Sequence, residues 1–278
     1  MRAFEDYRSM PSEFWALIKF VSETLGYTKQ REVSTYTITE LSNLFVYHSM
    51  PIDYQILVSV KNYCDKRAVV LNDFVRSALM DREAAETCFY NLYQNYYASE
   101  KLMCKIPLNK QSGDMKKVNY FTAIINMLTE MTIKGSLNHD GTPGFDDDPH
   151  GLVYVLDGRN NVIGASSRRF DGAYPSIINP RIVWERKEYY YTTTFGSRIV
   201  DGVYETQLDG HEFLDIANRT NYKITHVFFI DGFQTWWSQG KSYLCRIIDM
   251  LNSGLVDEVI FGKEVFERWP ALLSAFVG

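Results

Sequence analysis

Six consecutive residues at positions 225–230, Thr-His-Val-Phe-Phe-Ile, are apolar at nearly every position. β-Branched and aromatic residues favour strands, and a run without polar alternation is typical of a strand that is covered on both faces. We therefore predict that this run is the central strand of a sheet. Such a strand needs helices packed on both sides of it, which favours an α/β fold.

The segments around this run predict the order of the remaining elements. Apolar residues recur at helical spacing over residues 116–134. Two strands are predicted at 151–156 and 162–165, joined by a hairpin turn, and a third at 181–191. Further helices are predicted at 197–217 and 240–252, with a short strand at 258–261. The predicted core is therefore α-β-β-β-α-β, a mixed sheet flanked by helices.

Residues 1–113 are predicted to form a helical N-terminal region ahead of a core domain at 114–278, with the boundary in the Pro-, Asn- and Gly-containing stretch 107–115. Thr37 and Glu40 have the spacing of a capping box. The helix they begin, followed by Pro51 and a second helix, also fits a helix-turn-helix that reads DNA. The alternative, a helical bundle that shapes the protein or forms its dimer contact, is the preferred interpretation.

Three polar residues within the predicted strands have a specific chemical use. Glu185 and Lys187 lie two residues apart in the third strand, so their side chains should point to one face, opposite Trp184 and Arg186. Asp171 follows the second strand and should lie beside them if the two strands pair. Mg²⁺ takes oxygen ligands and often needs only one or two protein carboxylates. Asp171 and Glu185 are therefore candidate metal ligands, and a lysine beside the metal can position an attacking water.

An Asp, thirteen residues, and then Glu-x-Lys resembles the signature of the PD-(D/E)XK (restriction-endonuclease-like) nuclease superfamily, and the resemblance covers roughly residues 115–262. Phe170 stands where the signature has Pro. The resemblance implies that Asp171 and Glu185 bind Mg²⁺ and that Lys187 assists the nucleophilic water. It also makes Glu130, on the helix before the first core strand, a candidate third acid, with a solvated charge on that helix as the alternative. The alternative is a surface strand in which Glu185 and Lys187 are only an ion pair.

The charge distribution favours a nucleic-acid partner close to this motif. The net charge of the chain is -5, but between residues 159 and 198 seven basic residues occur with three acidic ones. Neutralisation of phosphates by Lys and Arg provides most non-specific affinity for nucleic acid. Eight residues are predicted to contact DNA: Arg168, Arg169, Arg186, Tyr190, Thr193, Ser197, Arg198 and Lys241.

Lys241 and Ser242 open a helix after the apolar strand, where a phosphate-binding loop would lie. The first Gly of a P-loop would fall at Thr235, and two Trp residues occupy the middle of the segment. We therefore expect a DNA-phosphate contact here instead of a nucleotide site.

The predicted function is Mg²⁺-dependent hydrolysis of phosphodiesters in double-stranded DNA, site-specific as in type II restriction endonucleases. Cleavage of both strands of a palindrome would call for a homodimer. Two alternatives stay open: a nuclease effector of a defence or repair complex without its own sequence specificity, and a catalytically silent DNA-binding protein of the same fold.

The remaining composition predicts a cytoplasmic protein without a membrane span. The N-terminal residues lack an apolar leader segment, and no apolar run approaches the length of a transmembrane helix. The four Cys residues form no CxxC pair and are expected to be reduced thiols in the core.

Overall fold

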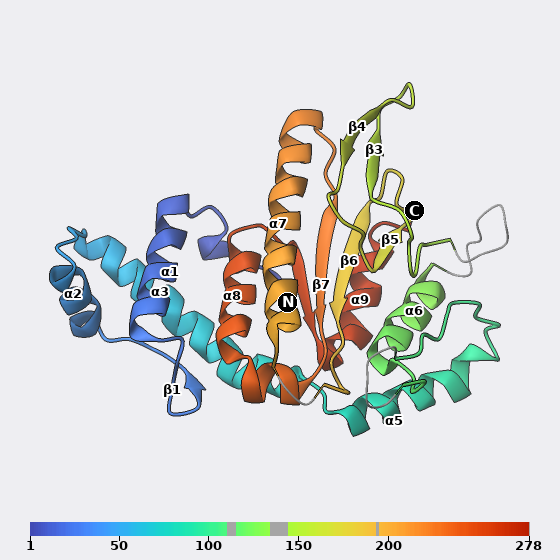
Figure 1. The fold of residues 1–278 in the computed structure, drawn as a ribbon, viewed down its shortest axis with the longest axis horizontal. Coiled ribbons are helices and arrows are strands. Elements are labelled where there is room, and N and C mark those ends of the chain that lie inside the picture. Colours follow the sequence, from blue (N-terminus) through green and yellow to red (C-terminus); the bar gives the residue numbers. More distant parts are fainter. Residues whose placement is uncertain (110–114, 134–143, 193–194, 278) are drawn as a thin grey trace.

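A computed structural model describes residues 1–109, 115–133, 144–192 and 195–277 of the protein (Figure 1). Its centre is a mixed four-stranded sheet in which β5 and β6 are antiparallel, whereas β6, β7 and β8 are parallel to one another. In spatial order the strands are β5 (Gly172–Tyr174), β6 (Ile182–Lys187), β7 (Thr225–Ile230) and β8 (Glu258–Phe261). The protein is therefore a mixed α/β protein, as predicted.

Helices cover both faces of this sheet (Figure 1). Alternate side chains of β7 enter different cores: Phe229 packs with Trp184 and Trp269 on one side, and Phe228 packs with Leu244 on the other. The first face carries α5 (Arg82–Leu92), α6 (Tyr120–Thr132) and α9 (Val265–Ser274), and the second carries α7 (Ser197–Thr220) and α8 (Lys241–Asn252). The prediction of a central strand at 225–230 is confirmed.

The N-terminal helices have their own hydrophobic core. They are α1 (Ser12–Leu25), α2 (Ile38–Tyr47) and α3 (Tyr54–Val69), and β1 (Thr28–Lys29) pairs with β2 (Glu32–Val33) between the first two. The short α4 (Arg76–Ala78) follows, and its Ala78 packs in the same cluster as Phe228 of the sheet. The predicted capping box is confirmed, because Glu40 N donates to Thr37 Oγ1 and Thr37 N donates to Glu40 Oε2. Shorter turns complete the chain: 3₁₀ turns at Glu5–Tyr7 and Gly262–Glu264, and π-helical turns at Val70–Val75, Tyr93–Tyr97 and Phe233–Gln239.

A buried ion pair joins the N-terminal helices to the sheet layer. Arg67 on α3 is fully buried and donates through Nη1 to Asp249 Oδ2 on α8 at 2.8 Å. The hydroxyl of Tyr63 donates to the other oxygen of Asp249 at 2.6 Å. Removal of Asp249 would leave a buried guanidinium without its counter-charge, so these two contacts fix the N-terminal helices against α8.

The predicted sheet membership needs a correction. β3 (Tyr154–Leu156) and β4 (Val162–Ala165) pair only with each other among named strands and form a separate two-stranded sheet. Asp157 accepts from Arg159 N and Asn161 N, and this tight turn folds β4 back onto β3. The four-stranded sheet instead includes β5, a strand not expected from the sequence, and β8.

Residues 82–104, which form α5 and the stretch after it, lie before the expected domain boundary at residue 113 but pack with the residues that follow it. Phe89, Leu102 and Cys104 belong to the same buried cluster as Trp184 and Phe229 of the sheet. Residues 82–104 therefore pack with the C-terminal part of the chain. The four cysteines are free thiols, and burial raises the pKa of Cys245 to about 12. Within the described ranges, none of the helices combines the length and apolar character that a membrane span requires.

His226 on β7 is a core residue, and it predicts a pH dependence of folding. Its ring lies against Phe170 and Phe213, its Nδ1 donates to Leu255 O at 3.1 Å, and burial lowers its pKa from 6.5 to about 4. Between pH 6.5 and about 4 the unfolded chain therefore takes up a proton that the folded chain does not. We expect the free energy of unfolding to fall by about 3 kcal/mol over this range because of His226.

Urea unfolding at pH 7 and pH 4 measures this effect. In His226→Leu that part of the decrease should disappear, whatever the absolute stability of the variant. An equal decrease in both proteins would assign the acid sensitivity to other groups.

Candidate functional site

The two candidate metal ligands face each other across neighbouring strands. β5 pairs with β6 in a register that places Gly172 opposite Trp184, so Asp171, one residue before β5, lies opposite Glu185. Asp171 N donates to Trp184 O at 3.1 Å and continues the pairing. Residues directly opposite in an antiparallel pair point to the same face with Cβ atoms about 4.5–5.5 Å apart. The two carboxylates therefore face each other through β5, and the expected pairing of the strand at 162–165 with β6 is wrong, because β4 pairs with β3.

Lys187 completes the trio on the same face of β6. Its Nζ donates to Glu185 Oε1. Trp184 lies in the opposite core, and Arg186 Nη1 donates to Asp171 O at 3.0 Å away from the Glu185 face. The alternation predicted from the sequence is therefore confirmed for Trp184, Glu185 and Lys187, whereas Arg186 also lines the pocket that contains Glu185.

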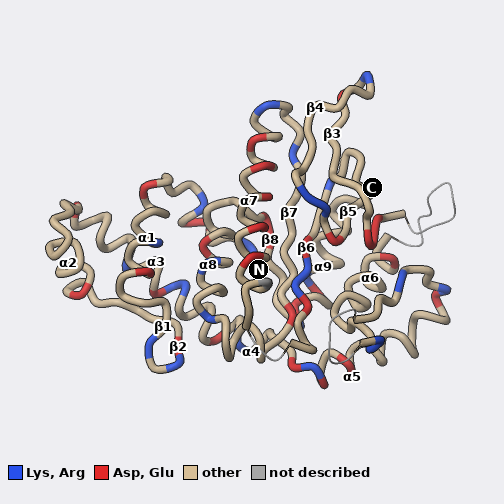
Figure 2. Tube along the Cα trace, viewed as in Figure 1, with Lys and Arg blue, Asp and Glu red and all other residues tan. Residues whose placement is uncertain are grey.

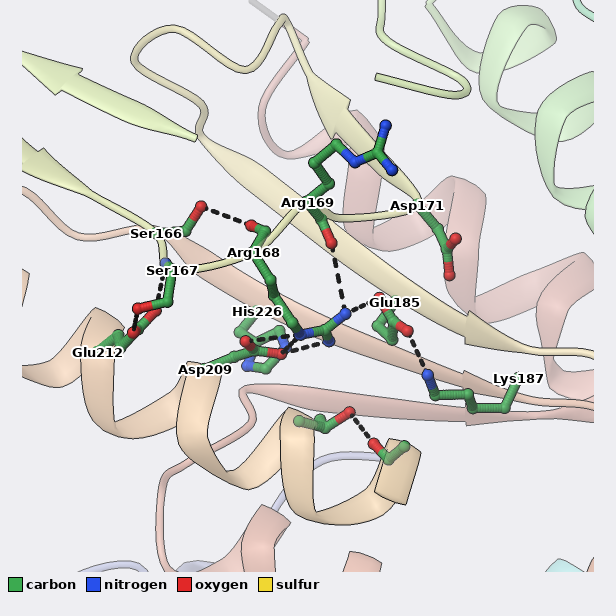
Figure 3. Close-up of polar contacts among 12 residues, drawn as sticks. Ser166, Ser167, Arg168, Arg169, Asp171, Glu185, Lys187, Asp209, Glu212 and His226 are labelled. Atoms are coloured by element: carbon green, nitrogen blue, oxygen red, sulfur yellow. Dashed lines mark hydrogen bonds and ion pairs between the residues drawn. The ribbon is translucent and has the colours of Figure 1, made fainter. Parts of the chain in front are cut away.

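Arg168 donates a hydrogen bond to the second carboxylate oxygen of Glu185. Figure 3 shows its guanidinium between Asp209 of α7 and Glu185 of β6. Arg168 Nε donates to both Asp209 oxygens at 3.0 and 3.1 Å, and Nη2 also donates to Asp209. Only Nη1 reaches Glu185 Oε2, at 3.2 Å. Arg168 is thus anchored on α7, and its contact with Glu185 is the weakest of these bonds.

The trio lies in a cavity of about 570 Å³ between the edge of the sheet and the first turns of α7, which we name the acidic pocket. Its charged lining consists of Asp171, Glu185, Glu188, Asp201, Glu205, Arg186 and Lys187. Five carboxylates thus outnumber two cations. Burial, and then the charge of Asp171, raise the pKa of Glu185 to about 7 against the opposing effects of Lys187 and Arg168.

The basic surroundings expected from the sequence are therefore wrong for the pocket itself. Asp201, Glu205 and Asp209 are spaced four residues apart on α7 and lie on one side of the helix. Figure 2 shows acidic positions (red) along α7. This i, i+4, i+8 spacing is visible in the sequence and is the signal that could have identified them.

Asp171 and Glu185 offer the type of oxygen donor that a divalent cation takes. Asp171 Oδ2 accepts from Arg186 N at 2.8 Å, which orients the carboxylate. The described residues contain no cluster of three or more His, Cys, Asp or Glu arranged around one metal position. Asp171 and Glu185 supply two hard oxygen ligands, which is the number that Mg²⁺ commonly takes from a protein when phosphate and water complete its coordination.

Glu130 is not part of this site, which corrects its prediction as a third acid. Its carboxylate is buried and accepts from Met103 N at 2.9 Å and from Cys104 N at 2.7 Å. Thr122, which does line the acidic pocket, is two turns away along α6, or about 12 Å. Both oxygens of Glu130 serve to hold the segment 103–104 against α6.

Glu188, which directly follows Lys187, also lines the acidic pocket, and this role was not predicted from the sequence. It accepts from Phe121 N at 3.1 Å, from Thr122 N at 2.9 Å and from Thr122 Oγ1 at 2.7 Å. The two backbone N–H groups have no partner within α6 because they belong to its first turn, where a carboxylate is favoured. Glu188 therefore fixes the start of α6 at the edge of the acidic pocket.

The predicted DNA contacts are distributed unevenly. Arg169 is exposed and points away from Glu185 (Figure 3), and Ser197 is exposed at the start of α7 beside the acidic pocket. The hydroxyl of Tyr190 is buried and therefore unsuited to contact DNA. Lys241 Nζ donates to Trp237 O at 2.5 Å and lies over the Trp237 ring. Thr193 and the side chain of Arg198 lie outside the described part of the structure.

Gly202 of α7 provides a test of how closely Lys187 must be placed. A Cβ at this position would lie 2.6 Å from Lys187 Cε and 2.9 Å from Nζ, so Gly202→Ala must displace the ammonium group. Alanine in a helix interior is more stable than glycine by roughly 0.5–1 kcal/mol. We expect Gly202→Ala to unfold no more readily than the wild type and to lack the DNA cleavage that the motif predicts. Thermal unfolding and cleavage assays on the same preparation measure both, and unchanged cleavage would show that the position of Lys187 is unimportant.

Comparisons with known proteins identify two family models. A model described as “Domain of unknown function (DUF7687)” matches residues 80–276, and one described as “Domain of unknown function (DUF7690)” matches residues 1–74. No curated protein matches the chain, and no solved structure matches it. The two matches adjoin between residues 74 and 80, close to where α5 begins to pack with the sheet.

Proposed function

The chain belongs to the family described as “Domain of unknown function (DUF7687)”, and from the geometry of the acidic pocket we propose that it is a Mg²⁺-dependent endonuclease of the restriction-endonuclease-like class. The observation that carries this proposal is the cross-strand placement of Asp171 and Glu185 with Lys187 on the same face. The proposed substrate is double-stranded DNA, and the proposed assembly is a homodimer.

The three residues have distinct roles in this proposal. Asp171 and Glu185 would hold Mg²⁺, which supplies charge stabilisation at the scissile phosphate and lowers the pKa of a water. Lys187 orients the attacking water and stabilises the charge that develops on the phosphate oxygens. Arg168 would stay bound to Asp209 if Glu185 held a cation, because only one of its contacts reaches Glu185.

The acidity of the pocket supports a role for the cation in substrate binding. Five carboxylates around a phosphate position repel DNA unless a cation lies between them. Ser197 is exposed and lines the pocket, and Arg169 is exposed two residues before Asp171; these two are the proposed phosphate contacts. The proposal therefore predicts that productive DNA binding depends on a divalent cation.

A second candidate function rests on one observation. Both oxygens of Glu185 already contact cationic groups, Lys187 and Arg168, as they would in a structural ion pair. A protein of this kind would bind DNA or assemble with partners without cutting. The two candidates differ in their response to Mg²⁺, because only the nuclease requires the ion.

Incubation with mixed plasmid and phage DNA in Mg²⁺ and in EDTA, followed by sequencing of the ends, tests the proposal. We expect cleavage in Mg²⁺ and none in EDTA. Discrete fragments would assign a recognition site, and a smear would favour an effector without its own specificity. Undiminished cutting in the chelator would contradict the mechanism, and no cutting of any DNA in Mg²⁺ would favour the silent protein.

A further inference from the structure

A second cavity of about 660 Å³ adjoins the acidic pocket, and we name it the side pocket. The two cavities share Asn119 and Arg186 in their linings. The wall formed by Ile106, Pro107 and Leu108 is apolar, whereas the α6 side carries Asn126. The rest of the lining is polar or charged and includes Lys105, Asp147, Asp148 and Arg186, so the side pocket combines one apolar wall with a polar floor.

Asn126 lines this cavity and carries a buried acceptor without a partner among the described residues. Its side chain is 1% exposed, and its Nδ2 donates to Lys105 O at 3.0 Å. A carbonyl can only accept, so the amide nitrogen must face Lys105 and the amide oxygen must face the other way. Within the described residues Oδ1 has no hydrogen-bond partner. A buried acceptor without a partner costs about 1–3 kcal/mol, which a ligand that donates to it would recover.

The position of Asn126 relative to the proposed site of hydrolysis suggests the ligand. Asn119, Thr122 and Asn126 are three and four residues apart, so they follow one face of α6 from the acidic pocket to the side pocket. Thr122 and Asn126 are separated by about 6 Å along the helix. A group bound at Asn126 and a phosphate bound at Asp171 and Glu185 would therefore be close enough to belong to the same stretch of one DNA strand.

We infer that the side pocket binds one unstacked nucleobase of the substrate, next to the scissile phosphate, and that Asn126 Oδ1 accepts a hydrogen bond from an N–H on the edge of that base. A base has two apolar faces and a polar edge, which match the Ile106–Leu108 wall and the Asn126 floor. Enzymes that extrude a base read it by hydrogen bonds to its edge and by packing on its faces. This inference rests on the proposed nuclease function and assigns Asn126 as a specificity residue.

Glu130 offers a matched control for substitutions of Asn126. Asn126 and Glu130 both hold the segment 103–105 against α6, Asn126 through Lys105 O and Glu130 through Met103 N and Cys104 N. Glu130→Gln weakens this attachment but leaves the Asn126 oxygen in place. Asn126→Leu removes the oxygen, and Asn126→Asp retains an acceptor while it loses the bond to Lys105.

Equilibrium binding of single-stranded oligonucleotides tests the inference without cleavage. The protein carries Lys187→Ala, the buffer contains Ca²⁺, and each oligonucleotide has one abasic site at a different position. We expect one abasic position to weaken binding roughly tenfold, since contacts to one base are worth about that much. Asn126→Leu should abolish this sensitivity, whereas Asn126→Asp and Glu130→Gln should keep it.

The outcomes separate this inference from the proposed function. If binding occurs but no abasic position matters, or if Glu130→Gln removes the sensitivity as fully as Asn126→Leu does, the base site is contradicted and Mg²⁺-dependent cleavage is unaffected. If the Lys187-intact protein cuts no DNA in Mg²⁺ while the abasic sensitivity and its loss in Asn126→Leu persist, the hydrolysis proposal fails and the base site stands.

Discussion

Replacement of Lys187 by Ala is expected to abolish DNA cleavage, with a loss of at least about a hundredfold, because its Nζ is the only ammonium that lines the acidic pocket within the described residues. Arg186→Ala should retain cleavage and mainly weaken DNA binding or stability. Its guanidinium donates to Asp171 O and to Asp147 O on the other side of β6. Initial rates at saturating DNA, measured for both variants after circular dichroism shows that they fold, give the comparison.

The two adjacent substitutions are matched because each removes one positive charge from the same strand. A general loss of electrostatic attraction would therefore affect both proteins alike. If Lys187→Ala cut DNA and Arg186→Ala did not, the catalytic basic side chain would lie on the opposite face of β6 from the one proposed.

Neutralisation of one carboxylate is expected to strengthen DNA binding in EDTA. Asp171 and Glu185 would both face the scissile phosphate without a cation between them. Two unit charges at about 4 Å repel by about 1 kcal/mol in bulk water and about 4 kcal/mol at an effective dielectric of 20. Asp171→Asn and Glu185→Gln should therefore bind duplex DNA in EDTA as tightly as the wild type or more tightly, and should cut nothing when Mg²⁺ is restored.

Asp215→Asn is the control for general charge effects, because Asp215 is exposed on α7 and pairs with Arg219 away from the acidic pocket. Titrations at two salt concentrations separate phosphate contacts common to all variants from the local repulsion. Weaker binding by Glu185→Gln together with retained cleavage would place the carboxylates outside the active site and favour a structural ion pair with Lys187.

The parts of the fold that depend on local patterns could be predicted from the sequence. Alternation along a strand correctly placed Glu185 and Lys187 on one face, and the capping box correctly marked the start of α2. Both features depend on residues no more than a few positions apart. The apolar run at 225–230 likewise predicts its own burial between two layers.

Features that depend on pairing between distant segments could not be predicted. β5 is three residues long and has no pattern of its own, and only its register with β6 places Asp171 opposite Glu185. The hairpin of β3 and β4 has strand-like residues but exposes Val162 and Ile163, so it stays outside the core sheet. Glu130 lies on the predicted helix, but its partners are backbone groups of residues 103–104, which no spacing in the sequence indicates.

The charge of the site was predicted incorrectly for the same reason. Counting charges near the motif in the sequence gives a basic segment, whereas packing adds Asp201 and Glu205 from α7 to the acidic pocket. In the proposed mechanism this acidity makes the divalent cation a requirement for phosphate binding as well as for hydrolysis.

Binding of Mn²⁺, measured by electron paramagnetic resonance at pH 8, tests most directly whether Asp171 and Glu185 hold a divalent cation. The measurement needs no knowledge of the DNA sequence, and pH 8 keeps Glu185 ionised above its pKa of about 7. We predict saturable binding of Mn²⁺ by the wild type, its competition by Mg²⁺, and its loss in Asp171→Asn and in Glu185→Gln, but not in Asp215→Asn. Equal Mn²⁺ binding by the wild type and both carboxylate variants would contradict the account.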